Sequence, residues 1–221
     1  MVSRRRAGEP VALILGRQAF WSLELAVDAS TLVPRADTER LVELALERLP
    51  ATSPRDVLDL GTGSGAIALA IASERPDANI TAVDASASAL AVASANARRL
   101  GLRARFLHGD WFGPVRGERF DLVLSNPPYL AGDDPHLPTL RHEPRSALVS
   151  GNTGMEAIAA ICDAAPAQLR GGGWLLFEHG DAQGAPSRAC LEAAGFARVQ
   201  TWQDIEGRDR VSGGQWIDAG D

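Results

Sequence analysis

From residue 56 onward, short apolar runs alternate with longer stretches in which apolar residues recur at helical spacing. Strand–helix alternation of this kind predicts an α/β protein with a mostly parallel sheet and helices on both of its faces. We expect strands over residues 57–60, 79–84, 103–108, 120–124, 174–178, 196–202 and 210–217, and helices over residues 66–74, 86–100, 155–169 and 185–194. The last two strands lie too close together for a helical crossover, so they are predicted to pair antiparallel at an edge of the sheet.

The first 50 residues follow a different pattern. Two strand-like runs, 11–15 and 19–27, are separated by three residues and predict a hairpin. Apolar residues at i, i+3 and i+4 predict a half-buried helix over residues 37–49, with Asp37 or Thr38 as its N-cap. We therefore expect a hairpin-and-helix arm over residues 1–50 and a larger domain over residues 51–221.

Composition limits the classes of function open to this chain. Its 221 residues, 45% of them hydrophobic and 23% charged, are typical of a globular protein with its own core. The formal net charge of −6 argues against a protein that coats nucleic acid through its overall field. No signal-peptide pattern opens the chain, and its longest apolar stretch, 66–72, is too short for a membrane span. Because Cys162 and Cys190 fit no disulfide framework, we expect a cytoplasmic protein.

A glycine-rich turn follows the first strand of the larger domain. Gly61, Gly63 and Gly65 allow the backbone to turn sharply and to approach a ligand closely. Asp84 lies 23 positions after Gly61, at the end of the next expected strand, where a carboxylate can accept hydrogen bonds from ribose hydroxyls. The two features predict an adenosine cofactor, and this motif alone leaves NAD open.

Asp110 and Trp111 follow the third expected strand. In an open parallel sheet, ligands bind at the carboxyl ends of the strands, so this pair is placed to meet an adenine ring. Trp111 would pack on the face of the ring, and Asp110 would accept from its exocyclic amine.

The most specific signal is the run Ser125-Asn126-Pro127-Pro128-Tyr129, directly after the fourth expected strand. Two consecutive prolines hold the backbone extended and supply carbonyls without N–H groups. The side-chain oxygen of Asn126 and the carbonyl of Pro127 would then form a fixed pair of acceptors for a planar NH₂ group. Holding both hydrogens points the nitrogen lone pair at an electrophile, and Tyr129 is placed to stack on the group that carries the nitrogen.

These motifs resemble those of S-adenosylmethionine-dependent amino methyltransferases, which act on planar nitrogens of adenine, guanine or glutamine. The terminal hairpin is also typical of this class I, Rossmann-like fold. Further segments narrow the resemblance to the HemK-type peptide chain release factor glutamine methyltransferases, and it extends over nearly the whole chain. These segments are residues 8–10, 14–16, 20–25, 32–39, 134–137, 143–148, 178–180 and 207–211.

The resemblance implies a role for each residue that matches a family motif. S-adenosylmethionine would be bound by Gly61, Thr62, Gly63, Ser64, Gly65, Asp84, Trp111 and Asn126. Substrate would be bound by Asn126, Pro127, Pro128 and Tyr129, of which Asn126, Pro127 and Tyr129 would be catalytic. The substrate implied is the glutamine side-chain amide in the Gly-Gly-Gln motif of class I release factors, and its methylation would modulate translation termination. The segment 20–38 would help to wall the substrate pocket.

The same resemblance implies one difference from other members. They carry a helical domain of several dozen residues before the Gly-Glu-Pro segment, whereas fewer than ten residues precede it here. Three alternatives remain at this point: a ribosomal protein glutamine methyltransferase, an adenine-N6 nucleic-acid methyltransferase, and a cofactor-binding module without catalysis. Binding of nucleic acid is not expected from the acidic net charge.

Several other residues are interpreted as structural. The four histidines do not cluster in the sequence, so no metal site is expected. Glu178 and His179 end the fifth expected strand and are assigned to packing and hydrogen bonding. The run Gly213-Gly214-Gln215 is interpreted as a turn in the terminal hairpin.

Overall fold

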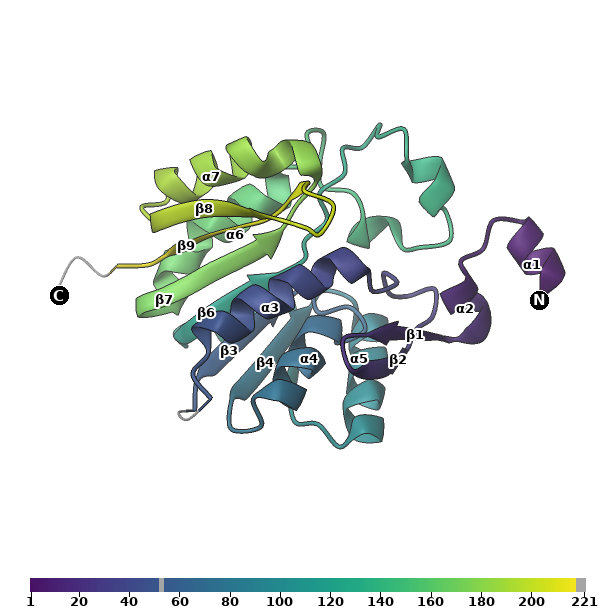
Figure 1. Ribbon diagram of the computed structural model, residues 1–221, viewed down its shortest axis with the longest axis horizontal. Helices are drawn as coiled ribbons and strands as arrows, with labels where there is room; N and C mark the ends of the chain where they lie inside the picture. Colours follow the sequence, from purple (N-terminus) through teal and green to yellow (C-terminus); the bar gives the residue numbers. More distant parts are fainter. Residues whose placement is uncertain (52–53, 218–221) are drawn as a thin grey trace.

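The computed structural model describes residues 1–51 and 54–217, and a seven-stranded sheet forms its centre (Figure 1). The strands are β3 (Asp56–Leu60), β4 (Asn79–Asp84), β5 (Arg105–His108), β6 (Phe120–Ser125), β7 (Leu169–Glu178), β8 (Ala197–Gln203) and β9 (Asp209–Gln215). Their spatial order is β5-β4-β3-β6-β7-β9-β8, in which β9 runs antiparallel to both β7 and β8 and the other pairs are parallel. The predicted mostly parallel sheet with a terminal antiparallel hairpin is confirmed. The expected 51–221 domain includes residues 52–53 and 218–221, which lie outside the described residues.

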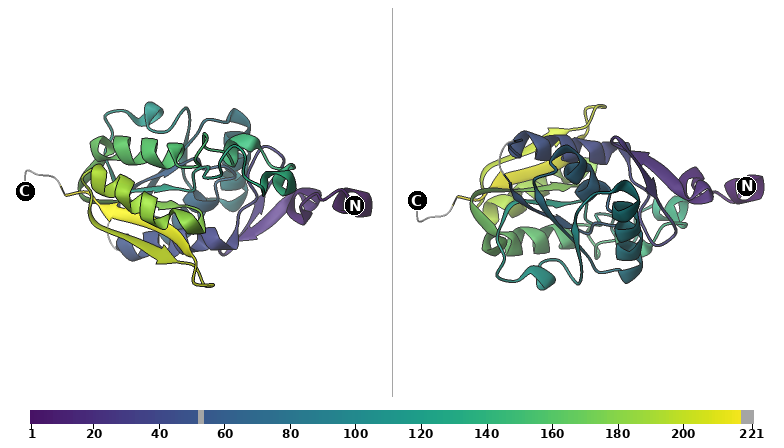
Figure 2. Two further views of the ribbon diagram at one scale, coloured as in Figure 1. Left: turned by 90° about the horizontal axis from the view of Figure 1, so that it is seen from above. Right: turned by 90° about the horizontal axis from the view of Figure 1, so that it is seen from below.

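Helices cover both faces of this sheet (Figures 1 and 2). They are α3 (Glu39–Arg48), α4 (Ala66–Glu74), α5 (Ala87–Leu100), α6 (Glu156–Ala164) and α7 (Gly184–Ala193). One buried cluster joins α3 and α4 to the sheet, and a second joins α6 and α7 to it. Every residue of α4 from Ala66 to Ala72 is buried, because α4 packs against β3 and β4 and also against α3, which lies beside it on the sheet. The helix expected over residues 86–100 is present as α5. The Ser86 hydroxyl caps its start, and Gly101 ends it with φ +67°.

The N-terminal segment corrects one prediction from the sequence. The run 11–15, expected as a strand, is the helix α2 (Val11–Leu15), which starts after Pro10 and ends at Gly16 with φ +69°. The hairpin consists instead of β1 (Arg17–Phe20) and β2 (Leu23–Ala26), which lie before and after a tight turn at Trp21. Five apolar residues fit a strand or a helix equally well, and here the proline and glycine at the two ends favour a single helical turn. A further five-residue helix, α1 (Val2–Arg6), precedes α2.

The second correction concerns residues 213–215, which lie within β9 and not in a turn. The turn of the terminal hairpin is formed by residues 204–208, where the amide of Asp204 donates to the carbonyl of Arg208. Gly213 is needed for close packing of strands, because a Cβ at this position would lie 2.5 Å from the carbonyl oxygen of Leu175 and 2.4 Å from Cδ2 of Leu176. A glycine in a strand interior often marks such a close approach.

We therefore expect Gly213→Ala to lower the free energy of unfolding by about 1–3 kcal/mol, because the added methyl group must displace backbone of β7. Gly113→Ala is the matched control, since a Cβ at Gly113 meets no atom within 4 Å, and it should change stability by less than about 0.5 kcal/mol. Urea denaturation followed by circular dichroism measures both. Equal stability of the two variants would contradict this account of Gly213.

Among the described residues, no helix combines the length and the apolar character needed to cross a lipid bilayer. Over the same part of the chain, His, Cys, Asp and Glu side chains form no group of three or more that could hold a metal ion.

Candidate functional site

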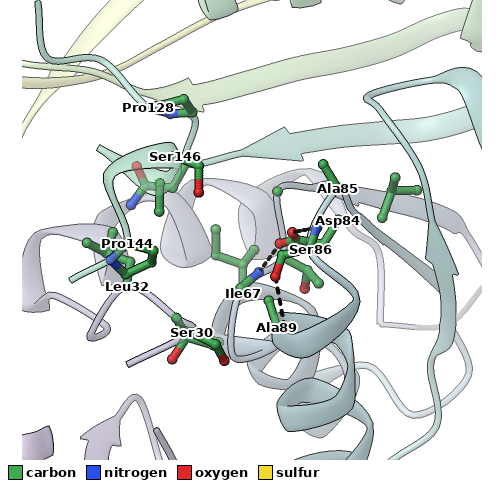
Figure 3. Close-up of a pocket in the computed structure, with 18 of the residues that line it drawn as sticks. Ser30, Leu32, Ile67, Asp84, Ala85, Ser86, Ala89, Pro128, Pro144 and Ser146 are labelled. Carbon is green, nitrogen blue, oxygen red and sulfur yellow. Dashed lines mark hydrogen bonds between the residues drawn. The ribbon is translucent and has the colours of Figure 1, made fainter. Parts of the chain in front are cut away.

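A cavity of about 340 Å³ lies at the carboxyl ends of four adjacent strands, β5, β4, β3 and β6. The turns that leave these strands supply one side of it, namely residues 61–63, 84–86, 109–111 and the pair Asn126 and Pro128. The opposite side is supplied by residues 30–32, 34, 35, 38, 144, 146 and 147. Figure 3 shows Asp84 and Ser86 facing Leu32 and Pro144 across the cavity. A crevice at the carboxyl edge of a parallel sheet is the usual ligand position in folds of this kind.

The glycine turn forms the floor of the cavity between β3 and α4. Gly61, Gly63 and Gly65 have φ of +71°, +56° and +87°, values that residues with a side chain rarely adopt. Gly61, Thr62 and Gly63 line the cavity. Ser64 and Gly65, predicted to bind the cofactor with them, do not line it: Ser64 is buried and its carbonyl accepts from Nδ2 of Asn96.

Asp59 lies beneath this turn and is completely buried. Its Oδ2 accepts hydrogen bonds from the Thr62 hydroxyl at 2.7 Å and from the amide of Ala68 at 3.2 Å. Burial raises the pKa of the Asp59 carboxyl to about 7. These bonds tie the turn to the start of α4 and hold its shape.

Asp84 faces the glycine turn from the end of β4. Its Oδ2 accepts from the amide of Gly63 and its Oδ1 from the amide of Ser86, both at 2.8 Å (Figure 3). The carboxylate is thus held in one orientation, with its remaining lone pairs available to ribose hydroxyls. Asp84 stands at the end of β4 as the sequence predicts, and its binding of a ribose stays a prediction.

Asp110 and Trp111 line the cavity beside Gly109, after β5. Trp111 has φ +40°, an uncommon backbone conformation for a residue with a large side chain. If Gly61 carried a Cβ, the nearest atom to it would be Cζ3 of Trp111, at 3.9 Å. The indole ring of Trp111 therefore lies over the glycine turn. An indole at this place offers an apolar wall against which a flat ring can pack.

Asn126 and Pro128 line the cavity at the end of β6, whereas Pro127 and Tyr129 do not. The Nδ2 group of Asn126 donates to Oγ1 of Thr38 at 3.1 Å. Its Oδ1 is buried and has no hydrogen-bond partner among the described residues. Leaving a buried acceptor unpaired costs about 1–3 kcal/mol of stability. Such an atom in a native structure needs an explanation, and a hydrogen bond to a bound ligand is one.

Thr38, which lines the cavity, links Asn126 to Glu178, which does not line it. The Thr38 hydroxyl donates to Oε2 of Glu178 at 2.6 Å, and the Tyr129 hydroxyl donates to Oε1 at 3.3 Å. Burial of Glu178 raises the pKa of its carboxyl to about 7, and burial of Tyr129 beside Glu178 raises the pKa of the phenol. Thr38, expected as an N-cap, stands at that position of α3 but makes no capping hydrogen bond, because its hydroxyl is bound to Glu178.

The wall opposite the glycine turn is held by Glu143. Its carboxylate accepts from the amide of Val33 at 2.9 Å and from Nη2 of Arg35 at 2.5 Å. The Glu143 side chain is 1% exposed, so a buried carboxylate joins two segments about 110 residues apart. Of segment 20–38, residues 30–32, 34, 35 and 38 line the cavity, and contact of this wall with the substrate stays a prediction. The resemblance implied this segment, but no local pattern indicates that Glu143 anchors it.

Comparison with known sequences gives close relatives. A family model described as the methyltransferase small domain matches residues 37–143. A release factor glutamine methyltransferase of Xylella fastidiosa is 54% identical over 97% of this chain and 79% of its own length. A second, from Vibrio cholerae, is 50% identical over 98% of this chain and 77% of its own length.

Solved structures with the same fold are more distant in sequence. A methyltransferase from Pyrococcus furiosus superposes with a TM-score of 0.70 at 18% identity, covering 97% of this chain and 99% of its own. The Thermus thermophilus 16S rRNA N2 G1207 methyltransferase, in complex with AdoMet and guanosine, has a TM-score of 0.65 at 23% identity. It covers 90% of this chain and 49% of its own. These likenesses establish the Rossmann-like methyltransferase fold.

Proposed function

The chain belongs to the release factor glutamine methyltransferases, and we propose that it methylates the glutamine side-chain amide in the Gly-Gly-Gln motif of class I peptide chain release factors. The observation that carries this proposal is the buried Oδ1 of Asn126, which has no hydrogen-bond partner among the described residues and belongs to a residue that lines the same cavity as Asp84. This acceptor matches a substrate whose reacting nitrogen carries two hydrogens.

The residues around the cavity fit S-adenosylmethionine. Gly61, Thr62 and Gly63 would hold its amino acid part, Asp84 its ribose hydroxyls, and Asp110 with Trp111 its adenine. When bound, S-adenosylmethionine supplies an electrophilic methyl group. Ser64 and Gly65 would contribute by shaping the turn, since neither lines the cavity.

Asn126 is the residue that would act on the substrate nitrogen. Its Oδ1 would accept one hydrogen of the glutamine amide, and the carbonyl of Pro127 would accept the other. With both hydrogens held, the nitrogen lone pair would be directed at the electrophilic methyl group. Catalysis would then consist of positioning and a matched pair of hydrogen bonds.

Tyr129 and Pro128 would complete the substrate pocket. Tyr129 is anchored through its hydroxyl to Glu178, so its ring is held in one orientation for stacking on the flat amide. Pro128 lines the cavity beside Asn126 and would limit the space for the glutamine side chain. Release factors work in translation, which places the proposed reaction in the cytoplasm.

Methyl transfer from labelled S-adenosylmethionine to a purified class I release factor tests this function. We expect label on the factor with Gly-Gly-Gln and none on a Gly-Gly-Ala variant. Label on both would place the modified atom elsewhere and refute the proposal. Absence of label on both, together with label on a ribosomal protein or on nucleic acid, would favour one of the two alternative substrates.

A further inference from the structure

The side-chain amide of asparagine has two ends of similar shape and opposite hydrogen-bonding character. Rotation by 180° about its last bond exchanges the oxygen acceptor with the NH₂ donor. If Asn126 accepts a hydrogen from an NH₂ group of the substrate, only one of these orientations is productive. The other orientation presents donors to donors, so the protein needs a means to select between them.

The contacts behind Asn126 select one orientation. A threonine hydroxyl has a single hydrogen, and that of Thr38 is given to Oε2 of Glu178 at 2.6 Å. Hydrogen bonds to a carboxylate are about twice as strong as those between neutral groups, so the Thr38 hydroxyl keeps its hydrogen directed at Glu178. Oγ1 of Thr38 can then offer only lone pairs to Asn126. Asn126 must place Nδ2 on Thr38, at 3.1 Å, and Oδ1 at the other end.

Charged and polar groups from several elements surround Glu178. Tyr129, after β6, donates to its second oxygen, and Asp37 faces it from the 3₁₀ turn before α3 (Ala36–Thr38). Arg210, on β9, attracts it and is itself held by Asp37 and Asp204. Tyr129 and Thr38 are both donors, and Arg210 is positive, so all three favour Glu178 as an ionised acceptor.

We propose that Thr38 and Glu178 are positioning residues that hold the Asn126 amide with Oδ1 toward the substrate nitrogen. This inference rests on the proposed function, because it takes Asn126 as the acceptor of the substrate hydrogen. Thr38 and Glu178 act through Asn126 and touch no reacting atom. Thr38 lies in the segment before α3 and Glu178 at the end of β7, so the amide is oriented by two elements that are distant in sequence.

Protonation of Glu178 would reverse the direction of these bonds. A neutral carboxyl can donate to Oγ1 of Thr38, whose own hydrogen is then free to turn toward Asn126. The Asn126 amide would then rotate, with Oδ1 toward Thr38 and the NH₂ group toward the substrate. This is the unproductive orientation. Burial raises the pKa of Glu178 to about 7, and the productive ionised form exists above that value. We therefore expect kcat at saturating S-adenosylmethionine to fall as the pH is lowered through about 7.

Thr38→Val tests the proposal because it keeps the shape of the side chain and removes the hydroxyl. We expect kcat for release factor methylation to fall roughly 10- to 100-fold, the scale of a misplaced catalytic group. Thr38→Ser restores the hydroxyl and should recover most of the rate. Thr81→Val makes the same exchange on buried β4, outside the cavity, and should change kcat by less than about twofold. Equal losses in the Thr38 and Thr81 valine variants would overturn the proposal.

Two further measurements distinguish a loss of the Asn126 orientation from an unspecific loss of activity. In an Asn126→Ala background, Thr38→Val should cost no additional rate, because no amide remains to be oriented, and additive losses would overturn the proposal. Glu178→Gln cannot ionise, so the fall in kcat below about pH 7 should disappear in that variant. If kcat of Glu178→Gln still falls below about pH 7, another group causes the pH dependence, and Asp59 is the first candidate.

Nuclear magnetic resonance tests the orientation without any substrate. The side-chain NH₂ of Asn126 should exchange slowly with water in the wild type at pH 8, and at least tenfold faster in Thr38→Val (about 1.4 kcal/mol of lost protection). Unchanged exchange would overturn the proposal even if the methylation rates agreed with it. Conversely, a wild type that labels no release factor would refute the proposed function, while the exchange rates would still decide the role of Thr38.

Discussion

Asn126→Ala should lower kcat for release factor methylation by about 10²–10³-fold, the scale seen when one preorganised hydrogen-bonding group is removed from a reacting centre. The variant loses the buried Oδ1 acceptor, and the cavity keeps the glycine turn, Asp84 and Trp111. The dissociation constant of S-adenosylmethionine should therefore change by less than about threefold, since no strong contact to the cofactor is removed. Single-turnover methylation and isothermal titration calorimetry measure the two quantities separately.

Asn79→Ala is the matched control for this variant. Asn79 is exposed at the opposite end of β4, where its side chain donates to Asp56. It should change neither quantity by more than about twofold. Equal losses of turnover and of cofactor affinity in Asn126→Ala would show that Asn126 serves the cavity as a whole and not the substrate nitrogen.

The second large effect is expected on cofactor binding. Asp84→Ala should raise the dissociation constant of S-adenosylmethionine by roughly 10- to 100-fold, because hydrogen bonds to a charged group contribute about 1.5–3 kcal/mol. The change removes the acceptor for ribose hydroxyls and also frees the amides of Gly63 and Ser86. Turnover at saturating cofactor should fall much less than affinity. Calorimetry with S-adenosylhomocysteine gives the same comparison without methyl transfer.

Asp77→Ala controls for the loss of negative charge. Asp77 is exposed in the turn before β4 and lies outside the cavity. Its removal should leave the dissociation constant within about twofold, since exposed charges act weakly over distance in salt. If Asp77→Ala weakened binding as much as Asp84→Ala, the effect would come from net charge, and the assignment of Asp84 to the ribose would be wrong.

The positions of the candidate residues at the ends of β3, β4, β5 and β6 could be predicted because each signal is local, whereas their roles stay predictions. Gly61 and Gly63 stand directly after a strand, and Asp84 ends the next one. The order of strands and helices places these turns at one edge of the sheet. The segment Asn126 to Tyr129 follows the same rule, and its two prolines restrict the backbone whatever surrounds it.

Residues whose role depends on a distant partner were interpreted less well. Thr38 has the sequence context of an N-cap, and only the approach of Glu178, 140 positions away, shows where its hydroxyl points. Glu178 was assigned to packing and hydrogen bonding, and the structure adds that it reaches Asn126 through Thr38. Gly213 resembles a turn residue locally, whereas its actual constraint is the backbone of β7.

Local sequence patterns predict the alternation of strands and helices, the glycine turn, the acid at the end of β4 and the Asn-Pro-Pro-Tyr segment, because propensity, periodicity and backbone restriction act over a few residues. The contacts by which Glu143 anchors the wall formed by residues 30–38, and by which Thr38 and Glu178 support Asn126, arise only when distant segments pack together. The tertiary structure also decided that residues 11–15 form a helix. Hydrogen bonds between side chains depend on distance and direction in space, and these are set only when the sheet and its helices have packed.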